Sequence, residues 1–148
     1  QLYRLPMKFS VRIPFVELLG FELQKFEGGE AEITFNPSED HLNSFDVVHG
    51  GASMTLLDVV MAHAARSVET EMGVVTIEMK TSFMRAAKGP LVAKGQLLHR
   101  SATMAFTEGR IFDAAGKLCA HATGTFKFVA RLPVGPGGAQ PLNRISTD

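Results

Sequence analysis

The sequence is poor in cysteine, because Cys119 is the only one among 148 residues. A single thiol cannot close a disulfide within the chain and cannot alone supply a structural zinc site. We therefore expect a reducing compartment, the cytoplasm. Four histidines lack a second histidine four residues away, so we predict no metal site and expect each to be a surface or strand residue. These are His41, His63, His99 and His121.

An excess of charge of one sign and long apolar runs are also absent. Fifteen Lys and Arg balance fifteen Asp and Glu, so no overall charge favours nucleic acid or an anionic membrane. No run of about 18 apolar residues could span a bilayer. Residues 1–15 lack the apolar core of a secretory signal. We expect no nucleic-acid partner, no membrane partner and no export.

The length predicts one domain, since about 150 residues make one domain. We place residues 1–13 in an N-terminal segment and residues 14–130 in the domain. Residues 131–148 are rich in proline and glycine and poor in apolar residues, so we expect a flexible tail there.

Two regions of alternating apolar and polar residues flank one apolar segment. Residues 21–26 and 30–35 alternate around a Gly-Gly pair, as in a β-hairpin. Residues 50–69 predict a helix that is buried on all sides, because no polar face is left until Arg66. Alternation then returns near residues 75–80, 91–99, 104–112 and 118–128. The pattern predicts an α+β fold in which an antiparallel sheet of six strands wraps around one long helix.

Asp58 stands in the apolar run LLDVVM of this helix. An unpaired carboxylate there would cost several kcal/mol or be driven to take up a proton. Burial would raise its pKa toward the range useful to a general base. A structural interpretation is also open, in which Thr55 or a hydroxyl of a neighbouring strand satisfies the carboxylate.

The same helix begins at Gly50, directly after His49. The first N–H groups of a helix have no partner within it, and the helix dipole favours negative oxygen there. The glycines leave this end open, or they only permit a tight turn. Gly50 and Asp58 lie about 12 Å apart along the axis at 1.5 Å per residue. Because reacting groups must lie about 3 Å apart, the two can share a substrate only from different subunits, as in a two-fold dimer with antiparallel helices.

The stretch NSFDVVHGGASMTLLD at residues 43–58, with VTIE at 75–78 and FMRAAKG at 83–89, resembles the hotdog-fold acyl-CoA thioesterases of the PaaI-like branch. The resemblance covers residues 14–128. It implies the hotdog fold, homodimers that pair into tetramers, and hydrolysis of an acyl-CoA to free acid and CoA without a cofactor.

Five residues carry over from the family pattern by this resemblance. Gly50 would supply the backbone N–H that polarises the thioester carbonyl, and Asp58 would act as general base or nucleophile. Asn43 and His49 would orient the thioester end and its loop. Thr76 would help to hold the attacking water, in keeping with the ability of a hydroxyl to donate or accept beside a carboxylate.

Two basic residues are candidate ligands of the CoA phosphates. Arg85 lies in FMRAA, which resembles a family stretch near CoA. The family stretch has proline at the position of Ala86 in this chain. Arg100 stands at the end of a predicted strand.

Two other functions are open on this pattern. A hydratase or dehydratase of acyl-CoA or acyl carrier protein uses the same fold, but such relatives place a proline near a catalytic histidine, and VVHGG has none. A non-catalytic acyl-CoA-binding protein is the second. Release of free thiol distinguishes a thioesterase from both.

Overall fold

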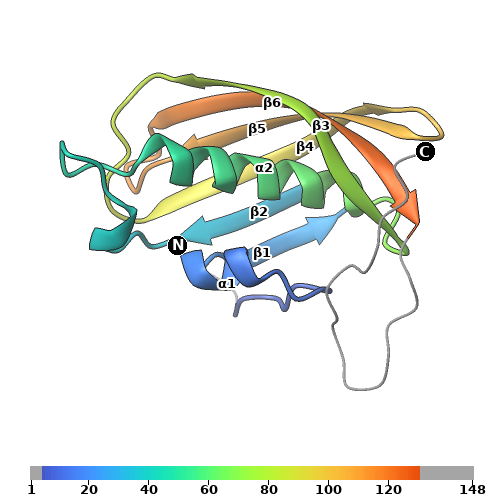
Figure 1. Cartoon of the computed structure of the whole chain (residues 1–148), viewed down its shortest axis with the longest axis horizontal. Coiled ribbons are helices and arrows are strands. Elements are labelled where there is room, and N and C mark those ends of the chain that lie inside the picture. Colours follow the sequence, from blue (N-terminus) through green and yellow to red (C-terminus); the bar gives the residue numbers. More distant parts are fainter. Residues whose placement is uncertain (1–4, 131–148) are drawn as a thin grey trace.

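The computed structural model describes residues 5–130, and its largest element is one antiparallel sheet (Figure 1). The six strands lie in the order β1-β2-β4-β5-β6-β3. Their bounds are β1 Glu22–Glu27, β2 Glu30–Phe35, β3 Met72–Phe83, β4 Leu91–Arg100, β5 Met104–Phe112 and β6 Leu118–Ala130. The predicted six-stranded antiparallel sheet with one long helix is confirmed. The tail expected at residues 131–148 lies outside the described residues.

The long helix is α2 (Gly50–Arg66), which lies across one face of the sheet (Figure 1). The short helix α1 (Pro14–Leu19) and the 3₁₀ turn η1 (Glu39–His41) precede it. Pro at the first position of α1 and Gly20 at its end, with φ of 75°, are the expected helix signals.

Small residues let α2 approach the sheet closely. A Cβ on Gly95 of β4 would stand 2.5 Å from the carbonyl oxygen of Val60, so any side chain there would push the helix away. Gly109 and Gly124 make similar room for Met61. The side chains of α2 that fill this interface are fully buried, namely Leu56, Leu57, Val60, Met61 and Ala64.

The prediction that α2 is buried on all sides is wrong for the single chain. A stripe of α2 stays partly or fully exposed at Gly51, Met54, Asp58 and Ala62, and Met54 is 40% exposed. The sheet covers one side of the helix, and the edge strand β3 reaches this stripe at Asp58.

The polar residues at the end of α2 are buried instead, with His63 only 3% and Arg66 only 5% exposed. The prediction of a surface or strand position for His63 is therefore wrong. The N-terminal segment covers this end: the Phe9 ring packs edge-on against His63 at 5.0 Å, and Arg66 Nη2 donates to Ser10 Oγ at 3.0 Å.

β3 is an edge strand with a β-bulge. Within the described residues it pairs only with β6, and the register shifts between Thr76 and Glu78. Ile77 therefore leaves the alternation and is 53% exposed. Val74 and Met79 pack against the core, so the bulge interrupts the strict alternation seen in the sequence.

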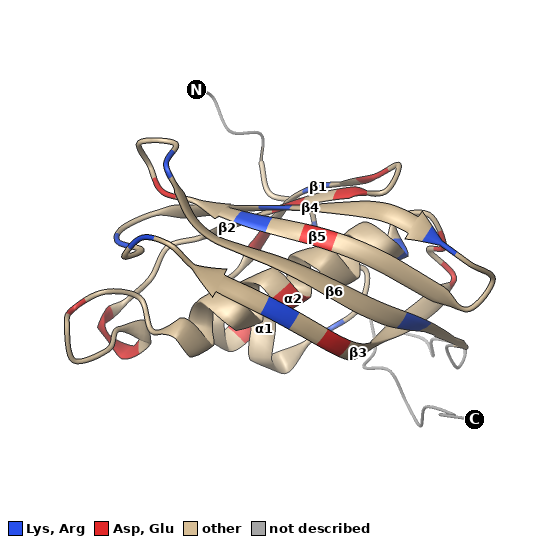
Figure 2. Ribbon diagram, turned by 90° about the horizontal axis from the view of Figure 1, so that it is seen from above, with Lys and Arg blue, Asp and Glu red and all other residues tan. Residues whose placement is uncertain are grey.

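Charged residues of both signs are mixed over the strands and loops (Figure 2). Among residues 5–130, no helix is long and apolar enough to cross a membrane.

Candidate functional site

The start of α2 places Gly50 in the wall of a pocket. His49 precedes the helix; its Nδ1 accepts from the N–H of Gly51 at 2.8 Å, and its carbonyl oxygen accepts from Ala52 and Ser53. The N–H of Gly50 finds no acceptor within the described part of the chain. A Cβ on Gly51 would stand 3.0 Å from His49 Nδ1, so glycine leaves room for this cap.

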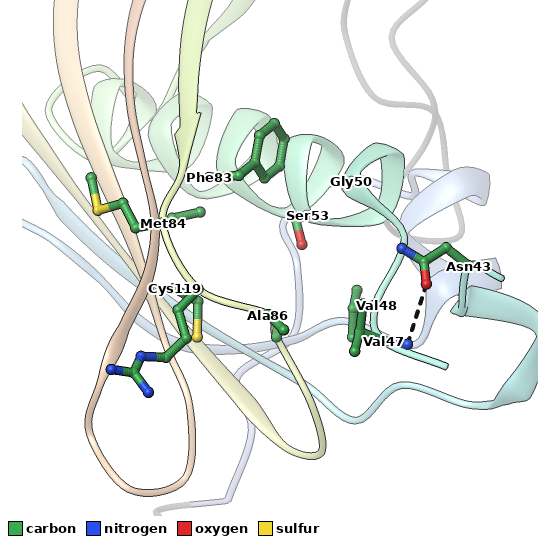
Figure 3. A pocket seen from close by; sticks show the side chains of 12 residues that line it. Asn43, Val47, Val48, Gly50, Ser53, Phe83, Met84, Ala86 and Cys119 are labelled. Carbon is green, nitrogen blue, oxygen red and sulfur yellow. Dashed lines mark hydrogen bonds between the residues drawn. The ribbon is translucent and has the colours of Figure 1, made fainter. Parts of the chain in front are cut away.

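The pocket beside Gly50, here called the Gly50 pocket, has a volume of about 400 Å³ (Figure 3). It is formed by the loop before α2, the first turn of α2, the end of β3 with the segment after it, and the start of β6. The lining residues are Asn43, Val47, Val48, Gly50, Ser53, Phe83, Met84, Arg85, Ala86, Ala87, Cys119 and Ala120.

Asn43 braces the loop that leads to the helix. Its Oδ1 accepts from the N–H groups of Phe45 at 2.9 Å and Val47 at 3.3 Å, the second of which is the dashed line in Figure 3. Its backbone N–H donates to the Val47 carbonyl at 2.8 Å. Asp46 has a φ of 57° within this turn. The side chain thus fixes the wall of the pocket next to Gly50.

Asp58 lies two turns further along α2 and meets β3. The Thr76 hydroxyl donates to Asp58 Oδ1 at 2.6 Å, whereas the Thr55 hydroxyl donates to the Gly51 carbonyl at 2.8 Å. The strand hydroxyl, rather than Thr55, is therefore the partner of the carboxylate. Burial raises the pKa of Asp58 and the hydrogen bond from Thr76 opposes that rise. The second oxygen, Oδ2, accepts no hydrogen bond from the described residues.

The structure brings the predicted residues together in two groups. Asn43, His49 and Gly50 lie at the start of α2, while Asp58 and Thr76 form a pair outside the Gly50 pocket. Along one helix the two groups are about 12 Å apart. A single chain therefore holds two halves of the predicted site and does not join them.

The two candidate CoA ligands differ in position. Arg85 lines the Gly50 pocket. Arg100 is not brought to this pocket: it pairs with Glu69 at 2.9 Å, donates to the Ser101 carbonyl, and lies 4.4 Å from the centre of the Phe128 ring. These contacts hold it near the other end of α2.

Of the twelve residues that line the Gly50 pocket, the sequence had assigned a role to Asn43, Gly50 and Arg85 alone. Ser53, Phe83 and Cys119 are examples of those it did not assign. Ser53 follows Gly50 by one helical turn, so its spacing could have indicated it. Phe83 opens the FMRAA segment. Cys119 gave no local signal, because it reaches the pocket through the backbone contact between its carbonyl and the N–H of Met84 at 2.9 Å. Burial raises the pKa of this thiol.

No group of three or more His, Cys, Asp or Glu residues is placed to hold a metal ion within residues 5–130.

Comparison with known proteins identifies the protein family. Residues 45–120, about half of the chain, match the model of the thioesterase superfamily. A protein of Saccharolobus solfataricus provisionally named an esterase is 32% identical over 80% of this chain and 84% of its own length. The chain belongs to the thioesterase superfamily, and its fold is the hotdog fold.

More specific names come from two further relatives. Human acyl-coenzyme A thioesterase 13 is 31% identical over 56% of this chain and 61% of its own length. A mutant of the phenylacetic acid degradation protein PaaI from Thermus thermophilus superposes with a TM-score of 0.72 at 26% identity, covering 78% of this chain and 98% of that one. The family and these similarities support thioester hydrolysis as the class of reaction.

Proposed function

We propose that the protein hydrolyses acyl-CoA thioesters in the cytoplasm, at sites that two copies of the chain build together. The observation that carries this proposal is that α2 bears two candidate catalytic groups at separate positions. A free N–H at Gly50 stands at its start, and a carboxylate with a hydroxyl partner stands about 12 Å further along. Neither a metal ion nor a cofactor is required.

The chemistry assigns one task to each half. The Gly50 N–H would donate to the thioester oxygen as negative charge develops there, helped by the dipole of α2. Asp58 of the partner subunit would remove a proton from water or attack the carbonyl carbon, and both routes use the same carboxylate. Since Thr76 donates its proton to Asp58 Oδ1, its oxygen can still accept a hydrogen bond from the attacking water.

The open edge of β3 supports an assembly of two copies. Its outer edge has no strand partner among the described residues, and Ile77, Phe83 and the neighbouring Met84 are each more than half exposed. A long edge strand that exposes apolar side chains at some of its positions favours pairing with another strand. Antiparallel pairing of β3 with its copy would set two α2 helices side by side through the exposed stripe that contains Met54. Further pairing of dimers into a tetramer is part of the proposal.

The Gly50 pocket is suited to the CoA side of the substrate. Arg85 at its wall offers a cation to phosphate, while Asn43 and His49 hold the loop that bears the Gly50 N–H. The name of the human relative, acyl-coenzyme A thioesterase 13, supports CoA as the thiol.

The test measures thiol release from a panel of acyl-CoA substrates. Gly50→Pro removes the N–H, and proline suits this first helical position because His49 before it has φ of −58° and ψ of 136°. Gly50→Ala keeps the N–H and is the matched control, since its Cβ would meet only the Phe83 ring at 3.5 Å. We expect Gly50→Pro to lose at least 100-fold in kcat, in line with loss of an oxyanion donor, and Gly50→Ala to lose far less.

Mixing two inactive variants tests whether the site is shared. Chains with Asp58→Asn and chains with Gly50→Pro are unfolded together and refolded, so that mixed dimers form. Each mixed dimer would contain one intact site, and random mixing would restore about a quarter of the wild-type activity. No recovery from mixed dimers would place both groups in one chain's site and contradict the proposal. Water added to or lost from the acyl chain, with the thioester intact, would indicate a hydratase instead.

A further inference from the structure

A second pocket lies on α2, beyond the Asp58–Thr76 pair. This pocket, here called the Ala62 pocket, has a volume of about 270 Å³. It lies between the N-terminal segment, the C-terminal half of α2 and the start of β3. Its lining residues are Val11, Arg12, Ile13, Pro14, Ala62, His63, Arg66 and Val74.

The lining residues of this pocket lie close to the Asp58–Thr76 pair on both α2 and β3. Ala62 follows Asp58 by one helical turn, about 6 Å along the axis, so both lie on the exposed stripe of α2. Val74 precedes Thr76 by two residues before the bulge, so both side chains lie on the same side of β3. The Ala62 pocket therefore begins one helical turn from Asp58 on α2 and two residues from Thr76 on β3.

The charged groups that line the Ala62 pocket have partners or are neutral. His63 Nδ1 bonds the Val59 carbonyl at 2.8 Å, and burial lowers the pKa of His63 to about 4, so the ring is uncharged at neutral pH. The Arg66 guanidinium donates to the Met72 carbonyl and to Ser10. Arg12 pairs with Glu17 at 3.3 Å. Valine, isoleucine, proline and alanine form the rest of the wall, which suits an uncharged, apolar ligand.

We infer that the Ala62 pocket binds the acyl chain of the substrate and that Val74, Ala62 and Ile13 set its length. The inference rests on the proposed function, which places the thioester between Asp58 and Gly50 of the partner subunit. The antiparallel pairing that aligns those groups places the partner's Gly50 pocket opposite the Ala62 pocket. CoA then lies on one side of the carbonyl and the acyl chain on the other.

The volume limits the acyl group. A benzene ring fills a cavity of about 150 Å³, so 270 Å³ holds about ten carbon atoms. Each methylene that leaves water should raise kcat/KM about fourfold until the pocket is full. The Ala62 pocket is thus expected to favour medium-length, uncharged acyl groups over acetyl.

The experiment compares kcat/KM for acetyl-, hexanoyl- and decanoyl-CoA, read by thiol release. Wild type should prefer hexanoyl-CoA over acetyl-CoA by at least tenfold. Val74→Phe and Ala62→Leu fill the pocket and should lower the decanoyl-to-acetyl ratio by at least tenfold. Ile13→Ala enlarges the pocket and should raise the decanoyl-to-hexanoyl ratio severalfold.

The matched control is Val92→Phe, which places the same side chain at a partly buried strand position in a pocket that contains no residue of α2. It should leave the ratios as in wild type. Light scattering of each variant reports the mass of the oligomer.

The partner's Phe45, 81% exposed at the tip of its loop, is the rival occupant of the Ala62 pocket.

Two outcomes overturn the inference. If Val74→Phe lowers kcat/KM for all three substrates equally, or splits the oligomer, the Ala62 pocket belongs to the interface and receives Phe45. If the ratios stay at the wild-type values in both filled variants, the acyl chain lies elsewhere. Failure of the proposed function differs from both, because wild type would then release thiol from no substrate in the acyl-CoA panel.

Discussion

Asp58 and His63 are two titratable side chains five residues apart on one apolar helix, and they differ in accessibility. Burial favours the neutral form of both, raising the pKa of Asp58 and lowering that of His63. Asp58 lies on the exposed stripe and has a hydroxyl partner on an open edge strand. His63 is closed in by the rings of Phe9 and Phe26. The comparison teaches that a polar residue in an apolar helix indicates chemistry only where the surrounding elements leave it accessible.

The largest expected effect is on activity at Asp58. Asp58→Ala removes the carboxylate and should lower kcat by 100- to 10,000-fold, the usual contribution of a positioned base. Thiol release measures the loss, and light scattering should give the wild-type mass. His63→Phe serves as the comparison. Because His63 lines the Ala62 pocket, its activity is read with acetyl-CoA, whose short acyl group does not fill that pocket, and most of the activity should be retained. Wild-type kinetics in Asp58→Ala would remove Asp58 from the mechanism.

The second effect is acid destabilisation through His63. The folded pKa of about 4 lies below the ordinary 6.5, so between these values the unfolded chain binds the proton and the folded chain does not. Stability is complete above pH 6.5 and falls by about 3 kcal/mol as the pH drops to 4. Denaturant unfolding at pH 7 and pH 4.5 measures this loss. His63→Phe should lose less stability over that interval, and an equal loss would show that another group titrates.

The third effect concerns the hydrogen bond from Thr76. Thr76→Val removes the donor that lowers the pKa of Asp58, so the acid limb of kcat/KM should move to higher pH. We also expect a decrease in kcat of about tenfold, since the attacking water loses a partner. Thr76→Ser keeps the hydroxyl and should restore both values. A pH profile that does not move in Thr76→Val would separate the hydroxyl from the ionisation of Asp58.

The smallest effect is on stability at Asp58. A raised folded pKa means that the charged carboxylate costs stability once the pH exceeds the ordinary Asp value. Asp58→Asn carries no charge and should raise Tm by a few degrees at pH 7. The gain should vanish as the pH falls toward 4, where the unfolded carboxylate also takes up its proton. A lower Tm at pH 7 would mean that the Thr76–Asp58 hydrogen bond outweighs the burial of charge.

Much of this fold could be predicted because its signals are local. The Gly28-Gly29 turn, with positive φ at both residues, and the alternation of the flanking strands specify the first hairpin. From the sequence, the partner of Asp58 could be Thr55 or a hydroxyl of a neighbouring strand, and nothing identified it as Thr76. Strict alternation with Val75, Ile77 and Met79 on the inner face would turn Thr76 outward, whereas the bulge at Ile77 lets Thr76 and Met79 lie on the same face.

The sequence by itself determined the order of the elements and the presence of a carboxylate within an apolar helix. Each depends on backbone preference or on neighbours within a few residues. Only the tertiary structure decided that the N-terminal segment buries His63, that Cys119 reaches the Gly50 pocket and that Asp58 remains accessible. The reason is that exposure depends on which distant segments pack over a residue, and packing partners leave no periodic signal in the chain.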